Sequence, residues 1–247
     1  MIFARAGPRI RLTLDAVTPE LRRAVVQRSV QILVLDAIWL VLFLVAAGTV
    51  RVWAAWAYLG LGVALAVVNF LVVAPRNPEV IVARSRGAQK GTKGFETWFG
   101  LVFGIAFLAL PVVAGLDAVR FGWSHLPEWL VWVGLGVVVL GNVPIVAAMV
   151  VNPHLEKTVR IQEDRGHRVI DTGAYAIVRH PMYVGTLLQQ LAVPLVLGSA
   201  WAFVPAAVVL AAMVGRTALE DRTLRAELPG YEEYTKRTRA RLLPGIW

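Results

Sequence analysis

Long runs of apolar residues alternate with short polar segments along most of this chain. An α-helix rises 1.5 Å per residue and therefore needs about 20 residues to cross a hydrocarbon core of roughly 30 Å. Four apolar runs reach this length, at residues 30–50, 52–74, 98–119 and 129–151. The pattern predicts four membrane-spanning helices.

A fifth apolar stretch, residues 184–214, is too long for one ordinary span and is interrupted by Pro194, Gly198-Ser199 and Pro205. We expect two short helices of about 15–17 residues, joined near Gly198-Ser199 as a tight hairpin. The chain would then be an all-α integral membrane protein with about six transmembrane helices. Helices this short are at the lower limit for crossing, which leaves open whether the hairpin fully spans the bilayer.

Basic residues are distributed unevenly between the apolar runs. From the N-terminus to the C-terminus the successive polar segments hold 6, 1, 5, 1, 5, 0 and 7 Lys and Arg residues. Short cytoplasmic segments are enriched in these residues, so the alternation predicts six crossings with both termini cytoplasmic, as in a bacterial inner membrane. We expect a membrane-surface segment at 1–29, a four-helix transmembrane region at 30–151, and a third region at 152–247 that contains the hairpin and a C-terminal helix.

The start of the chain predicts one further helix. Thr18, Pro19 and Glu20 have the residue types of an N-cap, a first helical position and an acidic first turn. Apolar residues then alternate with Arg22, Arg23 and Arg28. We expect an amphipathic helix that lies in the membrane interface before the first span.

Composition supports the membrane assignment and excludes several classes of protein. The chain of 247 residues is 57% hydrophobic and 17% charged, which excludes an ordinary soluble enzyme or a disordered protein. The net charge is +9, and the basic residues responsible for it lie beside the apolar runs. This placement is better explained by membrane topology and contact with anionic lipid than by binding to nucleic acid. The absence of cysteine excludes a thiolate site, and the histidines lack the spacing of a zinc site, so no metal is expected.

Polar residues with possible chemistry are concentrated before the hairpin. Three of the four histidines lie between Asn152 and Tyr183. Pro181 suits the first position of a helix, whose free N–H groups could bind an anion, and Gly185 could let a ligand approach the backbone. Arg179 and His180 could equally anchor this helix in lipid headgroups.

A second polar cluster follows the hairpin. Arg216 and Glu220 are four residues apart and so share one face of a helix. They could form a functional pair, or a surface ion pair with an arginine whose side chain reaches toward the headgroups.

Together the two clusters resemble the isoprenylcysteine carboxyl methyltransferase family and its phospholipid methyltransferase relatives. The resemblance covers roughly residues 152–247. It is made by Gly173-x-Tyr175-x-x-x-Arg179-His180-Pro181-x-Tyr183-x-Gly185, then Arg216-x-x-x-Glu220-Asp221, then Leu228-Pro229-Gly230-Tyr231-x-x-Tyr234, and finally Arg239, Pro244 and Trp247. The chain departs from the pattern at Asp221, where many members have Glu.

The resemblance implies a membrane enzyme that uses S-adenosyl-L-methionine bound at the cytoplasmic face. Arg216 is implied as the catalytic residue on the substrate side. The implied cofactor contacts are Gln162, His167, Arg168, Val169, Ile170, Tyr175, His180, Pro181, Met182, Tyr183 and Glu220. The acceptor would be a lipid or lipidic small molecule from the bilayer.

The nature of the acceptor and two other functions stay open on these residues. A carboxylate acceptor is favoured because it is already ionised and Arg216 could bind it with two hydrogen bonds. An amine or thiol would need a base such as His180 or His167. The His-Pro-x-Tyr-x-Gly element also occurs in membrane sterol reductases, so a reductase that uses a nicotinamide cofactor is one alternative, and a non-enzymatic docking protein is another.

Overall fold

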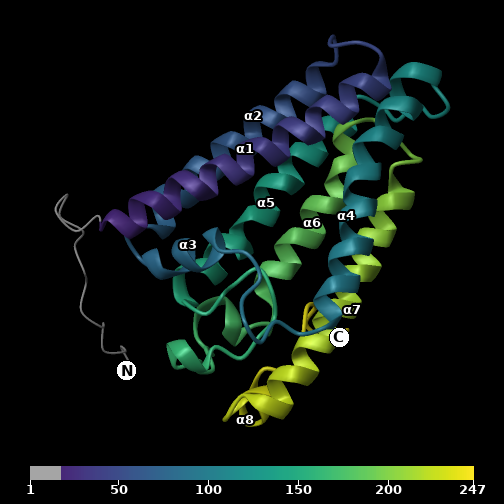
Figure 1. Ribbon diagram of the computed structural model, residues 1–247. Coiled ribbons are helices and arrows are strands. Elements are labelled where there is room, and N and C mark those ends of the chain that lie inside the picture. The colour runs from purple at the N-terminus through teal and green to yellow at the C-terminus, as the bar shows by residue number, and fades with distance from the viewer. Residues whose placement is uncertain (1–17) are drawn as a thin grey trace, which may run out of the picture.

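The computed structural model describes residues 18–247, and within them the fold is all-helical (Figure 1). The predicted segment 1–29 therefore lies partly outside the described residues. The α-helices are α1 (Pro19–Ala47), α2 (Trp53–Val73), α3 (Pro78–Ser85), α4 (Phe95–Ala114), α5 (Trp129–Val151), α6 (Pro181–Val196), α7 (Phe203–Glu227) and α8 (Tyr231–Arg237). A π-helical segment, Gly115–Phe121, continues α4.

Helix α1 begins as the sequence predicts but is longer than expected. The Thr18 side chain accepts a hydrogen bond from the backbone N–H of Leu21 at 3.2 Å, and Pro19 occupies the first turn. The helix then runs without a break for 29 residues. The expectation of a separate interfacial helix was wrong, because no residue between Glu20 and Val30 interrupts helical hydrogen bonding, and the amphipathic turns continue directly into the first span.

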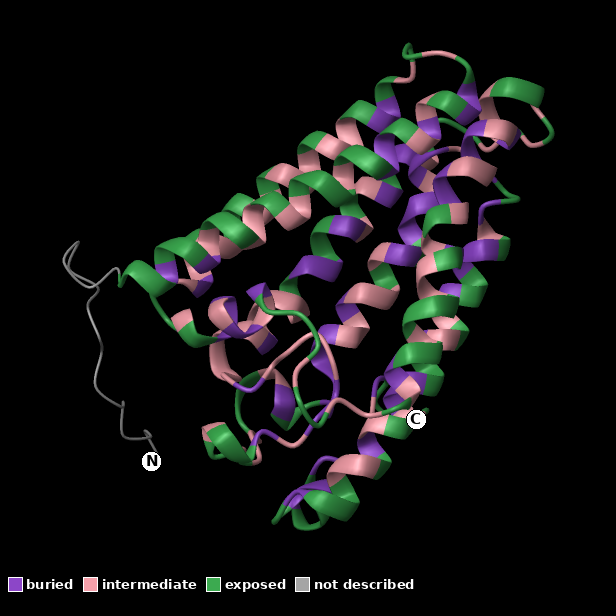
Figure 2. Cartoon of the chain, in the orientation of Figure 1, coloured by how far each residue is buried: buried purple, intermediate pink, exposed green. Residues whose placement is uncertain are grey.

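Within residues 18–247, five helices are long and apolar enough to cross a membrane, namely α1, α2, α4 with its π-helical continuation, α5 and α7. Large apolar side chains on their outer faces are exposed, including Leu71, Trp98 and Ile105. Figure 2 shows exposed positions along the outer faces of α1, α2 and α4. An apolar surface of this extent is stable only against lipid, so the chain is a multi-pass integral membrane protein.

Helices α6 and α7 form the predicted hairpin, with its turn at residues 197–202. Gly198 adopts a positive φ of 69° there, and the buried Asp117 accepts hydrogen bonds from Ser199 Oγ at 2.6 Å and Trp201 N at 3.1 Å. Helix α6 has 16 residues, about 24 Å of helix, as expected. Helix α7 has 25 residues, more than predicted, because it continues beyond the apolar stretch to Glu227.

Glycines bring α5 and α6 into close contact. A Cβ atom at Gly185 would overlap the carbonyl oxygen of Gly141, and one at Gly134 would lie 2.7 Å from Val196. The expectation that Gly185 leaves room for a ligand was therefore wrong, because α5 fills that space. The contact fixes α6, and with it the residues at its N-terminal end.

The long, basic connections between helices lie at one end of the bundle and the short connections at the other. Helices α3 and α8, residues 152–180, the start of α1 and the C-terminus gather at one end, which we call the site end (Figure 1). The short connections at 48–52, 122–128 and 197–202 lie at the other end. The segments that are rich in Lys and Arg thus share one end, as the charge alternation predicts.

Candidate active site

A cavity at the site end brings together most of the predicted site residues. Its walls are residues 152–180, the first turn of α6, α7 and the start of α8. Of the predicted residues, those that line it are Gln162, His167, Arg168, Val169, Ile170, Tyr175, His180, Met182, Tyr183, Arg216 and Glu220. Pro181 does not line the cavity, and instead begins α6.

Gln162 organises one wall of this cavity. Its side-chain amide donates to the carbonyl of His154 at 2.6 Å, and its backbone N–H donates to Nδ1 of His167 at 3.3 Å. Burial, together with the nearby His154 and arginines, lowers the pKa of His167 to about 4. His167 is therefore neutral near pH 7, which is the form that can accept this hydrogen bond.

Tyr175 forms the floor of the cavity from a single 3₁₀ turn. It is buried, and its hydroxyl accepts a hydrogen bond from the side-chain amide of Asn152 at 2.8 Å. Tyr234 on α8 donates its hydroxyl proton to the Tyr175 carbonyl at 2.7 Å. Burial raises the pKa of Tyr175, so its hydroxyl stays protonated. Val169 and Ile170 pack beside it in the same apolar cluster.

Asp221 joins the elements that surround the cavity. It is fully buried and accepts two hydrogen bonds from Arg179, at 2.7 and 3.1 Å. Arg241 and Arg225 donate to its second oxygen at 3.0 and 3.2 Å, and the Tyr231 hydroxyl donates to the first at 3.1 Å. We call these five residues the Asp221 junction. It links the N-terminal end of α6 to α7, α8 and the C-terminal segment.

Glu220, next to Asp221 in the chain, faces the cavity instead. It accepts a hydrogen bond from the Tyr183 hydroxyl at 2.5 Å and lies 3.9 Å from the Arg216 guanidinium. The predicted pairing of Arg216 and Glu220 on one face of α7 is thus present. The pair is not at the surface, because the Arg216 side chain is only 5% exposed.

Arg216 has more partners than the sequence indicates. Its Nε donates to Glu96 of α4 at 2.9 Å, one terminal nitrogen donates to the Tyr183 hydroxyl, and the other donates to the carbonyl of Lys157 at 3.0 Å. The guanidinium also lies over the rings of Phe99 and Tyr183. All three of its nitrogens are therefore occupied.

Sequence reasoning assigned no site role to five residues that form or support the cavity. Asn152, His154, Glu156 and Tyr231 all line the cavity, and Glu96 supports it through Arg216. His154 and Asn152 could have been found from their place in the polar segment that holds the other histidines. Glu96 carried no such signal, because it is 120 positions from Arg216 in sequence and opens an otherwise apolar helix.

The cavity offers groups that match the parts of S-adenosyl-L-methionine. The Glu220 carboxylate suits an ammonium or a sulfonium cation. The Nδ1 atom of the buried His154 has no hydrogen-bond partner within residues 18–247, although a buried nitrogen of this kind normally has one. Aromatic and aliphatic side chains complete the walls. The donors and acceptors present therefore fit this cofactor.

A second cavity of about 330 Å³ lies between the membrane helices. Helices α1, α2, α5 and α6 supply most of its lining, with Ile81 and Arg84 of α3 at the site end. Met182 lines both cavities. The two cavities thus adjoin at the first turn of α6.

Comparison with known proteins supports the resemblance. Residues 132–226 match the model of the Isoprenylcysteine carboxyl methyltransferase (ICMT) family. A solved structure of the eukaryotic intramembrane Ras methyltransferase ICMT (isoprenylcysteine carboxyl methyltransferase) is 21% identical, with a TM-score of 0.50, and the match covers 86% of this chain and 74% of that chain. At this identity the structural likeness shows a shared fold.

The family match begins within α5, about 20 residues before the region that the motifs indicated, and it ends at Ala226 of α7. No curated protein matches the sequence significantly. The match favours a methyltransferase over the reductase or the docking protein that the motifs alone left open. Residues 132–226, which hold most of the site, thus match the isoprenylcysteine carboxyl methyltransferase family, and the protein is an integral membrane methyltransferase that uses S-adenosyl-L-methionine.

Proposed function

We propose that this enzyme methylates the carboxylate of an amphiphilic acceptor that reaches the site from the membrane. The observation that carries the proposal is the meeting of the two cavities at Met182. A water-soluble cofactor can occupy the cavity at the site end, while an acyl or prenyl chain can occupy the cavity between the helices. The reacting groups of both would then meet beside Met182 and Tyr183.

The proposed cofactor contacts are the predicted residues that line the cavity, with His154 added. Glu220 would bind the cofactor's cationic part, and the first turn of α6 at Met182 its carboxylate. Tyr175 and Tyr183 offer ring faces for adenine or for the sulfonium. Gln162, His167 and residues 168–170 form the remaining wall, and their hydrogen bonds hold that wall in place before the cofactor binds.

Bound S-adenosyl-L-methionine would supply an electrophilic methyl group, which a carboxylate oxygen can accept without losing a proton. The chain therefore needs no general base for a carboxylate acceptor. Its task is to align the acceptor with the cofactor and to exclude water, and such alignment can contribute about 7–11 kcal/mol. Arg216 would place positive charge beside the reacting carboxylate, while Glu96 and Tyr183 hold its guanidinium in position.

We further propose that the site end faces the cytoplasm, with the chain in a bacterial inner membrane. The support is the charge distribution, since basic residues concentrate in the segments at this end. The cofactor is made in the cytoplasm and would reach the cavity directly.

The proposal is tested by calorimetric titration of the detergent-purified protein with S-adenosylhomocysteine, followed by transfer of a labelled methyl group to lipid extracts. We expect micromolar binding that Glu220→Ala and His180→Ala both abolish. Arg222→Ala on the same helix serves as the control, because Arg222 does not line the cavity. A folded, monodisperse wild-type protein that binds no S-adenosylhomocysteine would contradict the proposal.

A further inference from the structure

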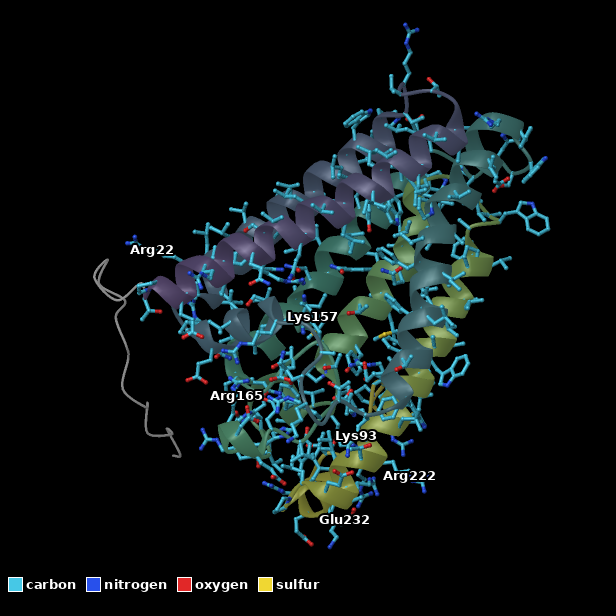
Figure 3. The ribbon with its side chains drawn as sticks, in the orientation of Figure 1. Arg22, Lys93, Lys157, Arg165, Arg222 and Glu232 are labelled. Atoms are coloured by element: carbon cyan, nitrogen blue, oxygen red, sulfur yellow. The ribbon has the colours of Figure 1, made fainter. Side chains whose placement is uncertain are left out.

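Three basic residues without an acidic partner among residues 18–247 lie at or beside the site end of the membrane cavity. Arg28 of α1 and Arg84 of α3 line this cavity. Lys157 lies next to Arg28, since Gln31 Oε1 accepts hydrogen bonds from Lys157 Nζ at 2.6 Å and from Arg28 at 3.4 Å. We call Arg28, Arg84 and Lys157 the open basic cluster. Lys157 is labelled near the centre of the molecule in Figure 3.

The positive charge of this cluster is not neutralised within the described part of the chain. No carboxylate of residues 18–247 lies within 4.0 Å of any of the three cations. The single acidic residue that lines the cavity is Asp36, eight residues from Arg28 and thus about 12 Å along α1. Glu156, the nearest acid in sequence to Lys157, is paired with Arg160 and Arg165.

The cluster is partly buried, unlike the other basic residues at the start of α1. Arg22 and Arg23 are exposed, and Figure 3 shows Arg22 at the outer side of α1. Burial, followed by repulsion from Arg28 and Arg84, lowers the pKa of Lys157 to about 8. Burial and repulsion from Arg28 likewise lower the pKa of Arg84 to about 10. Repelling cations held together without a counterion are typical of an anion site.

The cluster adjoins the reacting groups of the proposed function. The carbonyl of Lys157 accepts a hydrogen bond from Arg216 at 3.0 Å, and Arg84 donates to the carbonyl of the preceding residue, Glu156, at 3.3 Å. Arg216 already donates a hydrogen bond from each of its three nitrogens, whereas Arg28 and Arg84 each donate one side-chain hydrogen bond within residues 18–247. One carboxylate beside Arg216 would leave three further positive charges without a partner.

We propose that the natural acceptor carries a second anionic group, besides the carboxylate that is methylated, and that Arg28, Arg84 and Lys157 bind this group. The inference rests on the proposed function for the role of the ligand as methyl acceptor. It defines the substrate class as an amphiphile with one apolar chain and an acidic head of at least two negative charges. The second group could be a carboxylate or a phosphate, since both accept charge-assisted hydrogen bonds from arginine.

The test compares two probes with the same hexadecyl chain, octadecanoate with one acidic group and hexadecylsuccinate with two. Their binding is measured by calorimetry on protein saturated with S-adenosylhomocysteine, in micelles of a zwitterionic detergent. We expect hexadecylsuccinate to bind at least tenfold more tightly. Arg28→Gln and Arg84→Gln should each weaken its binding by about tenfold and change octadecanoate binding less than twofold.

Controls separate the possible failures. Arg86→Gln just after α3 and Arg23→Gln on α1 remove exposed charges and should leave both probes unaffected. Arg84→Lys retains the charge and should restore most of the discrimination, and unchanged affinity for S-adenosylhomocysteine shows that each variant is folded. A third probe, hexadecyl phosphate, distinguishes a phosphate group from a second carboxylate.

Equal binding of the two carboxylate probes would overturn the inference, and so would variants that weaken both probes alike, which would mean that the cluster binds the reacting carboxylate. Either result leaves the proposed function intact if the protein binds S-adenosylhomocysteine. Loss of that binding in the wild type would instead contradict the proposed function.

Discussion

Two arginine-rich clusters lie at the same end of this protein and differ in how their positive charge is neutralised. The Asp221 junction gathers Arg179, Arg225 and Arg241 around a carboxylate that is fully buried. The open basic cluster gathers a similar positive charge beside a cavity, without a carboxylate partner in the described part of the chain. The junction is complete, because its acceptor is occupied on both oxygens, whereas the cluster has unused donors.

The difference separates residues that hold the fold from residues that are available to a ligand. A buried charge without a partner costs free energy, so a protein keeps one only where something else compensates. The same difference separates two neighbours in the sequence. Both oxygens of Asp221 accept hydrogen bonds within the fold, whereas Glu220 faces the cavity.

The largest expected effect is a loss of stability when Asp221, at the centre of the Asp221 junction, is substituted. Asp221→Asn would leave Arg179 and its neighbours buried without a negative partner, so we expect a loss of about 3–5 kcal/mol in the free energy of unfolding. Thermal unfolding in detergent measures it. Arg222→Gln, at the exposed next position of α7, is the matched control and should change stability by less than about 0.5 kcal/mol. A wild-type melting curve for Asp221→Asn would show that the junction is not structural.

Substitution in the open basic cluster is expected to raise the stability of the ligand-free protein instead of lowering it. Arg84→Gln removes a cation whose lowered pKa shows that its charged form is unfavourable in the fold. We expect the ligand-free protein to gain about 0.5–1 kcal/mol, measured by the same melting curves, while binding of hexadecylsuccinate weakens. Loss of stability instead would show that Arg84 belongs with the structural arginines.

The smallest effect is a pH dependence. Lys157, with a pKa lowered to about 8, is charged at pH 7 and loses its proton as the pH rises to 9. It faces Arg28 and Arg84, and its backbone carbonyl faces Arg216, so an anion that binds there should raise its pKa and be bound less well at the higher pH. We expect about threefold weaker binding of hexadecylsuccinate at pH 9 and proton uptake on binding at pH 8, both visible by calorimetry. Lys157→Gln should show neither.

The features that the sequence predicted correctly depend on local patterns. Apolar runs of sufficient length specify the spans, Thr18 and Pro19 specify the start of α1, and Pro181 specifies the start of α6. The Arg216–Glu220 pairing followed from helical periodicity alone. Each of these predictions needed only residues within a few turns of one another.

The features that could not be predicted depend on contacts between distant segments. Glu96 reaches Arg216 only because α4 packs along α7. The space beside the Cα of Gly185 is occupied by the Gly141 backbone only because α5 packs on α6. Arg28 was interpreted as a charge of the membrane surface, and its place beside Arg84 and Lys157 depends on the arrangement of α1, α3 and the segment after α5. The roles assigned to individual cofactor-binding residues stay predictions.

The short helix α6 also links this enzyme to the thickness of its membrane. About 24 Å of helix is less than the roughly 30 Å of an average hydrocarbon core, so the turn after α6 lies below the surface of an average bilayer unless the lipids thin locally. Asp117 supplies the hydrogen-bond acceptors for Ser199 and Trp201 that water would supply outside the membrane. The hairpin is therefore matched best by lipids with shorter acyl chains. Longer acyl chains would place more strain on α6, the helix that carries Met182 and Tyr183 of the site.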